Sequence, residues 1–223
     1  MRIKFDMVGE TVDADEGMAV ISFDSFDMLA RCAHSVVTTE QSWMSVWRGE
    51  ERIRTGDVIL VDSLLNLPYQ NRRLSTAYAS KMISELDETE ELLARAEEIL
   101  ACTDGLISTL GAAYRTEPVG RDERDIKSLA KWLSLVPARN DDAPLPVRFL
   151  RFLDYVCDSG LFPLIVVVGL FANLAQDDIP EIVSKGRFEK IDILFLETLE
   201  TVSDICIPQI HIDEDWIVYD RTL

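Results

Sequence analysis

The sequence is poor in the residues and motifs that mark many enzymes. It has only 2 histidines and 4 cysteines in 223 residues, and no two cysteines have the CxxC spacing of a zinc or redox site. It contains no GxxxxGK[ST], GxGxxG or GxSxG motif and no Gly-Lys pair. These absences argue against binding of ATP or a dinucleotide by a standard phosphate loop, because that loop needs a run of glycine amides and a lysine.

Long apolar runs and basic charge are lacking as well. No apolar stretch approaches the ~20 residues of a membrane-spanning helix, and the first residues, MRIKFDMVGE, do not read as a signal peptide. We therefore expect a cytoplasmic protein with no membrane partner. The 22 basic residues face 40 acidic ones, for a formal net charge of −18, which argues against a general nucleic-acid coat but does not exclude a local basic patch.

Short apolar runs near the C-terminus are the clearest structural signal. LFPLIVVVGL begins at Leu161, IDILFL follows Lys190, and WIVY occupies 216–219. Strands that are apolar on both faces are typical of a parallel sheet covered by helices on both sides. Earlier strands are predicted at 2–5, 18–23, 43–47 and 57–61.

Helical periodicity fills the middle of the chain. It is strongest over 90–114 and recurs over 122–135 and 147–156. A further helix is predicted from Asp24 or Ser25 to Val37. Its apolar stripe is expected to contain Phe26, Leu29, Ala30 and Ala33. This order of elements predicts an α/β head, residues 1–66 and 157–223, interrupted by an α-helical insertion at 67–156.

Acidic side chains follow two of the predicted strands. Asp62 and Glu197 could meet at neighbouring strand ends and hold Mg²⁺, which would make the protein a phosphoryl-transfer or hydrolytic enzyme. Acidic residues also cap helices that follow strands, and this simpler interpretation is the one we favour. The histidines, His34 and His211, are interpreted as local hydrogen-bonding residues, and the cysteines as small buried hydrophobic residues.

Two further groups of charged residues could form sites. A metal could be held by the acidic group at the start of the 122–135 helix, or those carboxylates could simply complement the helix dipole. A groove of arginines could follow phosphates, or the arginines could be solvated and paired with carboxylates. The acidic group consists of Glu117, Asp122, Glu123 and Asp125. The arginines are Arg31, Arg48, Arg52, Arg54, Arg72 and Arg73.

An ordered set of segments resembles the small accessory protein family of type II-A CRISPR systems that acts in spacer acquisition. The segments are MRIKF, GMAVISFDSFDMLARCAHSV, IRTGDVILVDSLLNL, DIKSLAKWLSL, FPLIVVVGLFANLAQDDIPEIV, IDILFLET and IHIDEDWIVYD. No single segment is diagnostic, and the likeness depends on their order over nearly the whole chain. The loops near Pro118 and Pro144 depart from the family pattern.

This resemblance implies a fold and a function. Family members have a head similar to P-loop ATPases without a functional Walker motif, and an α-helical leg. They form homotetrameric rings that bind double-stranded DNA ends without sequence preference. Calcium supports the DNA-binding form, and no nucleotide or catalytic activity is involved. The partners are the CRISPR integrase pair and the type II effector nuclease. Arg31 matches a basic position of the family's first helix, and the acidic group of Glu117 lies near its calcium-proximal helix. A plain oligomeric scaffold for another protein is the remaining alternative.

Overall fold

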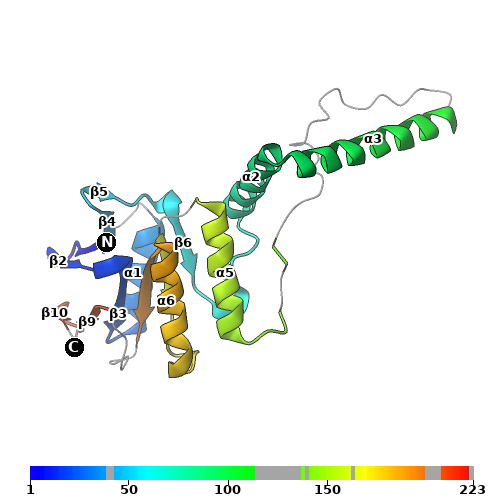
Figure 1. The fold of residues 1–223 in the computed structure, drawn as a ribbon. Coiled ribbons are helices and arrows are strands. Elements are labelled where there is room, and N and C mark those ends of the chain that lie inside the picture. Colours follow the sequence, from blue (N-terminus) through cyan, green and yellow to red (C-terminus); the bar gives the residue numbers. More distant parts are fainter. Residues whose placement is uncertain (39–42, 114–136, 139–140, 162–163, 199–206, 221–223) are drawn as a thin grey trace. The chain divides into compact units, whose positions relative to one another are not determined.

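The computed structural model divides the chain into two compact units. One contains residues 1–69 and 140–223, and the other contains 70–139. Figure 1 shows the elements of both. The structure describes residues 1–38, 43–113, 137–138, 141–161, 164–198 and 207–220.

A largely parallel sheet of six strands forms the centre of the first unit. Its order is β10-β9-β3-β8-β7-β6, in which β9, β3, β8, β7 and β6 run parallel and β10 pairs antiparallel with β9. The strand bounds are β3 Met18–Phe23, β6 Val58–Val61, β7 Leu164–Val168, β8 Asp192–Glu197, β9 Gln209–Ile212 and β10 Val218–Asp220. Residues of β3, β7 and β8 are buried almost throughout, because helices cover both faces of this part of the sheet.

The last apolar run is not a central strand. The prediction placed a strand at 216–219, but β10 begins at Val218 and is a half-exposed antiparallel edge. The strand that extends the parallel sheet is β9, whose alternating sequence QIHI has a polar residue in a buried row. That polar residue interrupts the apolar run, and so β9 was missed.

A second, antiparallel sheet packs near the N-terminus. Its order is β2-β1-β4-β5, with β1 Arg2–Phe5, β2 Glu10–Asp13, β4 Met44–Arg48 and β5 Glu51–Arg52. Short 3-10 turns are η1 Asp15–Gly17, η2 Thr55–Asp57, η3 Leu64–Asn66 and η4 Gln176–Asp178. The strands β2 and β5 are short and polar, which explains why hydrophobic periodicity did not predict them.

Helix α1 (Phe26–Val37) joins the two sheets into one core. Ser25 caps it by accepting a hydrogen bond from the Met28 amide at 3.3 Å. The core beneath it combines Ile3 and Phe5 of the small sheet with residues such as Ile21 of the large one. The buried stripe of α1 consists of Met28, Leu29, Cys32, Ala33, Ser35 and Val36. The expected stripe was wrong at Phe26 and Ala30, which are exposed.

The opposite face of the large sheet is covered by α6 (Ile179–Glu189), which contacts α5 (Leu145–Ser159). On α6, a Cβ added to Gly186 would lie 2.9 Å from Ile193 and 3.1 Å from Met18, so this helix approaches the sheet closely. Helix α5 buries Phe149, Phe152, Leu153, Tyr155 and Val156. The sequence prediction assigned most of α5 to the insertion, but this apolar face places it in the first unit.

The second unit contains α2 (Arg72–Glu88) and α3 (Glu90–Ala113), which contact each other. Asn71 caps α2, because its Oδ1 accepts hydrogen bonds from the amides of Arg73 and Leu74 at 3.0 and 3.1 Å. The helix predicted at 122–135 lies outside the described residues. None of the helices in the described part of the chain is long and apolar enough to cross a membrane. The fold is therefore mixed α/β, as predicted, while its likeness to a P-loop ATPase head stays a prediction.

Gly17 provides a test of how closely the turn before β3 approaches Asp192 of β8. Its φ of +76° disfavours any side chain, and an added Cβ would lie 2.2 Å from Oδ1 of Asp192. Gly17→Ala should therefore lower the melting temperature through backbone strain and through displacement of Asp192. Gly9→Ala is the matched control, since Gly9 has φ +73° with nothing within 4 Å of an added Cβ. We expect Gly9→Ala to cost about 1 kcal/mol and Gly17→Ala at least ~2 kcal/mol. If chemical denaturation gave the same loss of unfolding free energy for both variants, the Asp192 side chain would be shown to move aside at no cost.

Candidate functional site

Three buried polar side chains form a row across the carboxyl ends of the central strands. Ser22 of β3 is in register with Glu197 of β8 on one side and with His211 of β9 on the other. Their exposed fractions are 6%, 1% and 4%. Residues paired across parallel strands point to the same face, so the three side chains lie side by side. Ligands of open α/β sheets bind at this end of the strands, so the row is a candidate functional site.

Glu197 is a buried carboxylate held by the loop that follows β7. Its Oε1 accepts a hydrogen bond from the Phe171 amide at 3.0 Å, while Oε2 has no hydrogen-bond partner. Burial raises the pKa of Glu197 to about 7, and the amides of Phe171, Leu170 and Ala172 lower it against this effect. Desolvation therefore outweighs the hydrogen bonds, and near neutral pH this group is divided between its two protonation states.

The structure does not support the alternative interpretation in which Asp62 and Glu197 share Mg²⁺. Strand β7 lies between β6 and β8, so Asp62 and Glu197 do not follow neighbouring strands. Two strand spacings separate them by ~10 Å. The register also places Asp62 level with Leu196 rather than with Glu197, so the two carboxylates are directed to opposite faces. Asp62 is exposed and Glu197 is buried against an amide, so they do not form one site.

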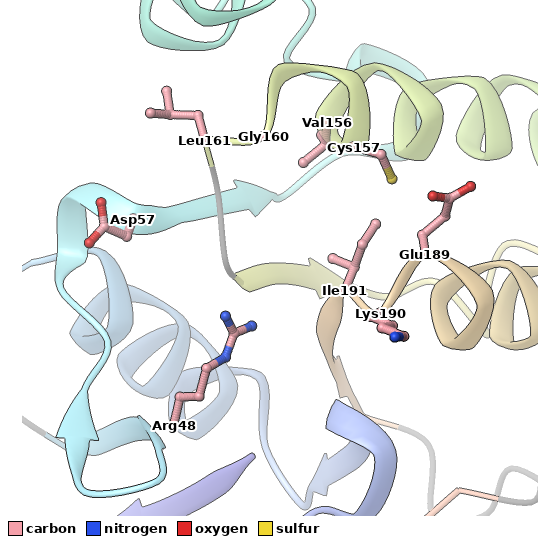
Figure 2. A pocket seen from close by; sticks show the side chains of 9 residues that line it. All are labelled: Arg48, Asp57, Val156, Cys157, Gly160, Leu161, Glu189, Lys190 and Ile191. Atoms are coloured by element: carbon pink, nitrogen blue, oxygen red, sulfur yellow. The ribbon is translucent and has the colours of Figure 1, made fainter.

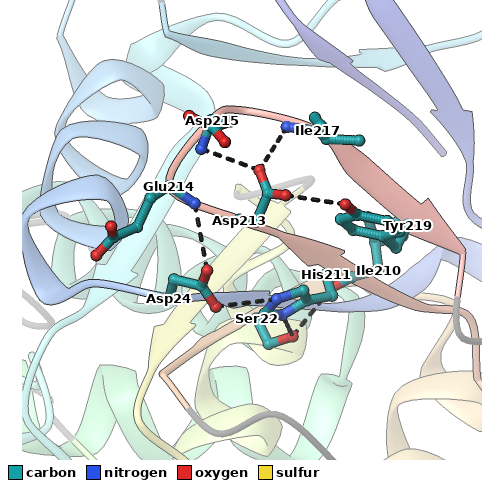
Figure 3. Close-up of polar contacts among 9 residues, drawn as sticks. All are labelled: Ser22, Asp24, Ile210, His211, Asp213, Glu214, Asp215, Ile217 and Tyr219. Carbon is teal, nitrogen blue, oxygen red and sulfur yellow. Dashed lines mark hydrogen bonds and ion pairs between the residues drawn. The ribbon is translucent and has the colours of Figure 1, made fainter.

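His211 connects the polar row to the loop after β3. Figure 3 shows its ring between Ser22 and Asp24. The distance from Nδ1 to Ser22 Oγ is 3.0 Å, and that from Nε2 to Asp24 Oδ1 is 3.0 Å. When Nε2 carries the hydrogen and donates it to Asp24 Oδ1, Nδ1 is left facing the serine hydroxyl.

The same types of residue form catalytic triads, but this arrangement differs from one. In a triad the serine is accessible and lies against Nε2, whereas Ser22 is buried, lies against Nδ1 and has the Ile210 carbonyl 3.3 Å from its hydroxyl. His211 therefore fastens β9 to β3. The sequence prediction of a local hydrogen-bonding role for His211 is consistent with this geometry.

Asp213 organises the turn between β9 and β10. Its Oδ1 accepts from the amides of Asp215 and Ile217 at 3.0 and 2.8 Å, and its Oδ2 accepts from the Tyr219 hydroxyl at 2.9 Å, as drawn in Figure 3. The Ile217 amide is the main cause of a lowered pKa for Asp213. The carboxylate of the acidic segment DEDW is thus used to hold the backbone of its own turn.

Arg31, the DNA-contact candidate that matches the family's first helix, is half exposed on α1. Its Nη2 lies 2.8 Å from Asp27 Oδ2, and its guanidinium lies over the ring of Trp43 at 5.0 Å. Trp43 in turn stacks on Trp216, with ring centroids 5.1 Å apart. The aromatic pair orients the guanidinium, and a phosphate would have to compete with Asp27 for it.

Arg48 lies at the other end of β4, ~17 Å along the strand from Trp43. Its Nε and Nη2 donate to Asp192 Oδ2 at 2.9 and 2.6 Å. It lines a pocket of about 540 Å³ at the amino ends of β6, β7 and β8, shown in Figure 2. Cys157 also lines this pocket, and burial raises its pKa to about 12, so the thiol is not ionised at neutral pH. The geometry of Arg48 is that of a structural ion pair, and its role in DNA contact stays a prediction.

The other candidate arginines are distributed over both units. Arg52 is paired with Trp47 in the β4–β5 hairpin, one residue out of step with Arg48, so the two point to opposite faces of the hairpin. Arg54 is exposed just beyond it, and Arg72 and Arg73 are exposed at the start of α2 in the second unit. Within the first unit, a single chain does not gather Arg31, Arg48 and Arg52 into one patch.

The predicted calcium ligands Glu117, Asp122, Glu123 and Asp125 lie outside the described residues. Elsewhere, in the part of the chain that the structure describes, no group of three or more His, Cys, Asp or Glu side chains is arranged to hold a metal ion. Comparison with known proteins adds no assignment, since no protein-family model and no curated protein matches the chain.

The raised pKa of Glu197 predicts a specific dependence of stability on pH. The pKa is 4.5 for the free group and about 7 in the folded chain, so the native state binds a proton more strongly than the unfolded state. The free energy of unfolding should therefore fall as pH rises from about 4.5 to about 7, by at most ~3 kcal/mol from this group. Glu197→Gln cannot titrate and should flatten this part of the profile in denaturation between pH 5 and pH 8. Asp62→Asn, an exposed control, should leave the wild-type slope, and an unchanged slope in Glu197→Gln would contradict the assignment.

The turn around Asp213 gives a second, independent test of stability. Asp213→Ala removes the acceptor of two amides and one hydroxyl, whereas Tyr219→Phe removes only the hydroxyl. We expect the first change to lower the melting temperature more than the second. Because the pKa of Asp213 is lowered, its contribution should be present above pH 4 and should diminish on further acidification. A larger effect from Tyr219→Phe would show that the backbone contacts of Asp213 are dispensable.

Proposed function

We propose that this chain binds the ends of double-stranded DNA, without sequence preference and without catalysis, as a homotetrameric ring that supports CRISPR spacer acquisition. The observation that carries the proposal is the ordered resemblance, from MRIKF to IHIDEDWIVYD, over nearly the whole chain. The division into an α/β unit and a separate helical unit is in keeping with the head and leg of that family. The cytoplasm, the integrase pair and the type II effector nuclease are its proposed location and partners.

The charge of the chain restricts how such a ring could hold DNA. A net charge of −18 repels phosphates over most of the surface, so binding must depend on a few arginines concentrated around one channel. One chain disperses these arginines, whereas four copies around an axis would present the same residue four times. Bound calcium would reduce the acidic charge, and its proposed ligands are Glu117, Asp122, Glu123 and Asp125.

The proposed mechanism needs backbone contacts alone. Exposed guanidinium groups bind phosphate oxygens, and a closed ring admits DNA only at an end, which gives end preference without base readout. Arg31 is the candidate that we place first, because Trp43 orients its guanidinium while its side chain remains half exposed. The ion pair with Asp27 is weak at the surface and can be exchanged for a phosphate.

Binding should distinguish linear from closed circular duplex in a gel-shift assay with Ca²⁺ or with a chelator. Arg31→Ala should weaken binding to linear DNA for every sequence. It should also reduce the slope of log affinity against log salt by about one for each phosphate that the side chain neutralises. Arg95→Ala is the matched control, since Arg95 is also an exposed helical arginine with an ion pair four residues away.

Two results would count against this function. Equal affinity for linear and closed circular DNA would remove the preference for ends. A mass that stays monomeric in solution, with and without Ca²⁺, would remove threading through a ring. A stable oligomer with no affinity for DNA would instead favour a scaffold for another protein.

A further inference from the structure

The loop between β7 and α6 places backbone amides around the carboxyl group of Glu197. Gly169, with φ +67°, starts the turn, and its amide donates to the Leu196 carbonyl at 2.9 Å. Asn173 closes the turn, because its amide donates to the Leu170 carbonyl at 3.1 Å and its Nδ2 to the Gly169 carbonyl at 2.6 Å. The Phe171 amide donates to Glu197 Oε1 at 3.0 Å, and the adjacent amides of Leu170 and Ala172 also lower the pKa of this carboxyl group.

Successive backbone amides that converge in this way form a site for anions. Such concave groups of N–H donors at the end of a strand bind phosphate in many α/β proteins, because the amides carry partial positive charge and need no side chain. Here the position follows a parallel strand of the central sheet. The anion that fills it is supplied by the chain itself.

Glu197 does not satisfy this site completely. Only one of its carboxylate oxygens has a hydrogen-bond partner, although the side chain is 1% exposed. A buried oxygen without a partner is costly, so the carboxylate is a poorly matched occupant. A tetrahedral oxyanion presents more oxygens to the same donors.

We propose that residues 169–173 form an oxyanion-binding cradle that Glu197 occupies in the free protein, and that a phosphate group can bind there once the Glu197 carboxylate is displaced. The ligand class is phosphate, as the free ion or as part of a nucleotide. This site is separate from the candidate DNA-contact arginines and does not depend on DNA-end binding.

Charge at this position decides when the cradle is available. A protonated Glu197 competes less well for the amides than its carboxylate, so binding of an external anion should be favoured below neutral pH. Among the described residues, the titratable groups along the same strand ends are Asp24, which follows the neighbouring strand β3, and His211, Asp213 and Asp62, each two strands away. His211 is engaged by Ser22 and Asp24.

Isothermal titration calorimetry with inorganic phosphate tests the cradle directly. Glu197→Ala should bind phosphate at least ~10-fold more tightly than the wild type, which is the factor that ~1.4 kcal/mol supplies. Glu197→Gln, which leaves a side chain of the same size in the cradle, should stay within a few-fold of the wild type. Adding Ala172→Pro to Glu197→Ala removes one amide donor without loss of a buried side chain and should reverse the gain. Titration with ATP distinguishes a nucleotide phosphate from the free ion.

The proposal is overturned if folded Glu197→Ala binds phosphate and ATP no better than the wild type, or if Ala172→Pro leaves the gain unchanged. Should Glu197→Ala fail to fold, sulfate binding to the wild type decides the question, since sulfate keeps its charge between pH 6 and pH 8. The cradle predicts a larger sulfate-induced increase in melting temperature at pH 6 than at pH 8. Equal increases at both values would exclude it.

Discussion

Burial of the parallel sheet on both faces is the constraint on which the rest of the first unit depends. One face is covered by α1 and through it by the small sheet, and the other is covered by α6, in contact with α5. A polar group within such a sheet has no water to bind, so it must find a partner inside the protein. The row of Ser22, Glu197 and His211 is the outcome: each is bonded to a neighbouring strand or loop. These serine, glutamate and histidine side chains, which are of types common in catalytic sites, here connect strands and loops.

Electrostatics makes the opposite demand at the surface. With an excess of acidic residues, exposed arginines readily find carboxylates, and Arg31 and Arg48 both do so. The two pairs differ in kind. Asp192 is buried, so breaking its pair with Arg48 would leave a buried carboxylate without its partner. Asp27 and Arg31 are both exposed, so their ion pair can be exchanged for other partners at little cost in free energy. An arginine of the second kind is the one suited to binding a phosphate.

The sequence predicts the fold well where apolar burial alone decides the structure. The strands at 2–5 and 18–23 have the predicted bounds, because their residues are buried in a regular pattern. Prediction failed at β9, where His211 interrupts the apolar run, and at β2 and β5, which are short, polar strands paired only with the strand just before them. The site was harder still. Glu197 was recognised as a strand-end carboxylate, but its partner is a backbone amide. Almost every residue has such an amide, so the sequence does not show which one will bind the carboxylate. Ser22 and His211 are 189 residues apart, and only strand order brings them together.

The order of strands in the large sheet also bears on how the chain folds. Strand β3 is complete at Phe23, yet both of its neighbours, β8 and β9, come from the last third of the chain. During synthesis one of its edges therefore stays open until β8 has left the ribosome and the other until β9 has, while the helices of the second unit can form from local contacts. An exposed apolar strand with two free edges is a template for pairing with other chains. We therefore expect the nascent protein to depend on chaperones until its C-terminal strands arrive.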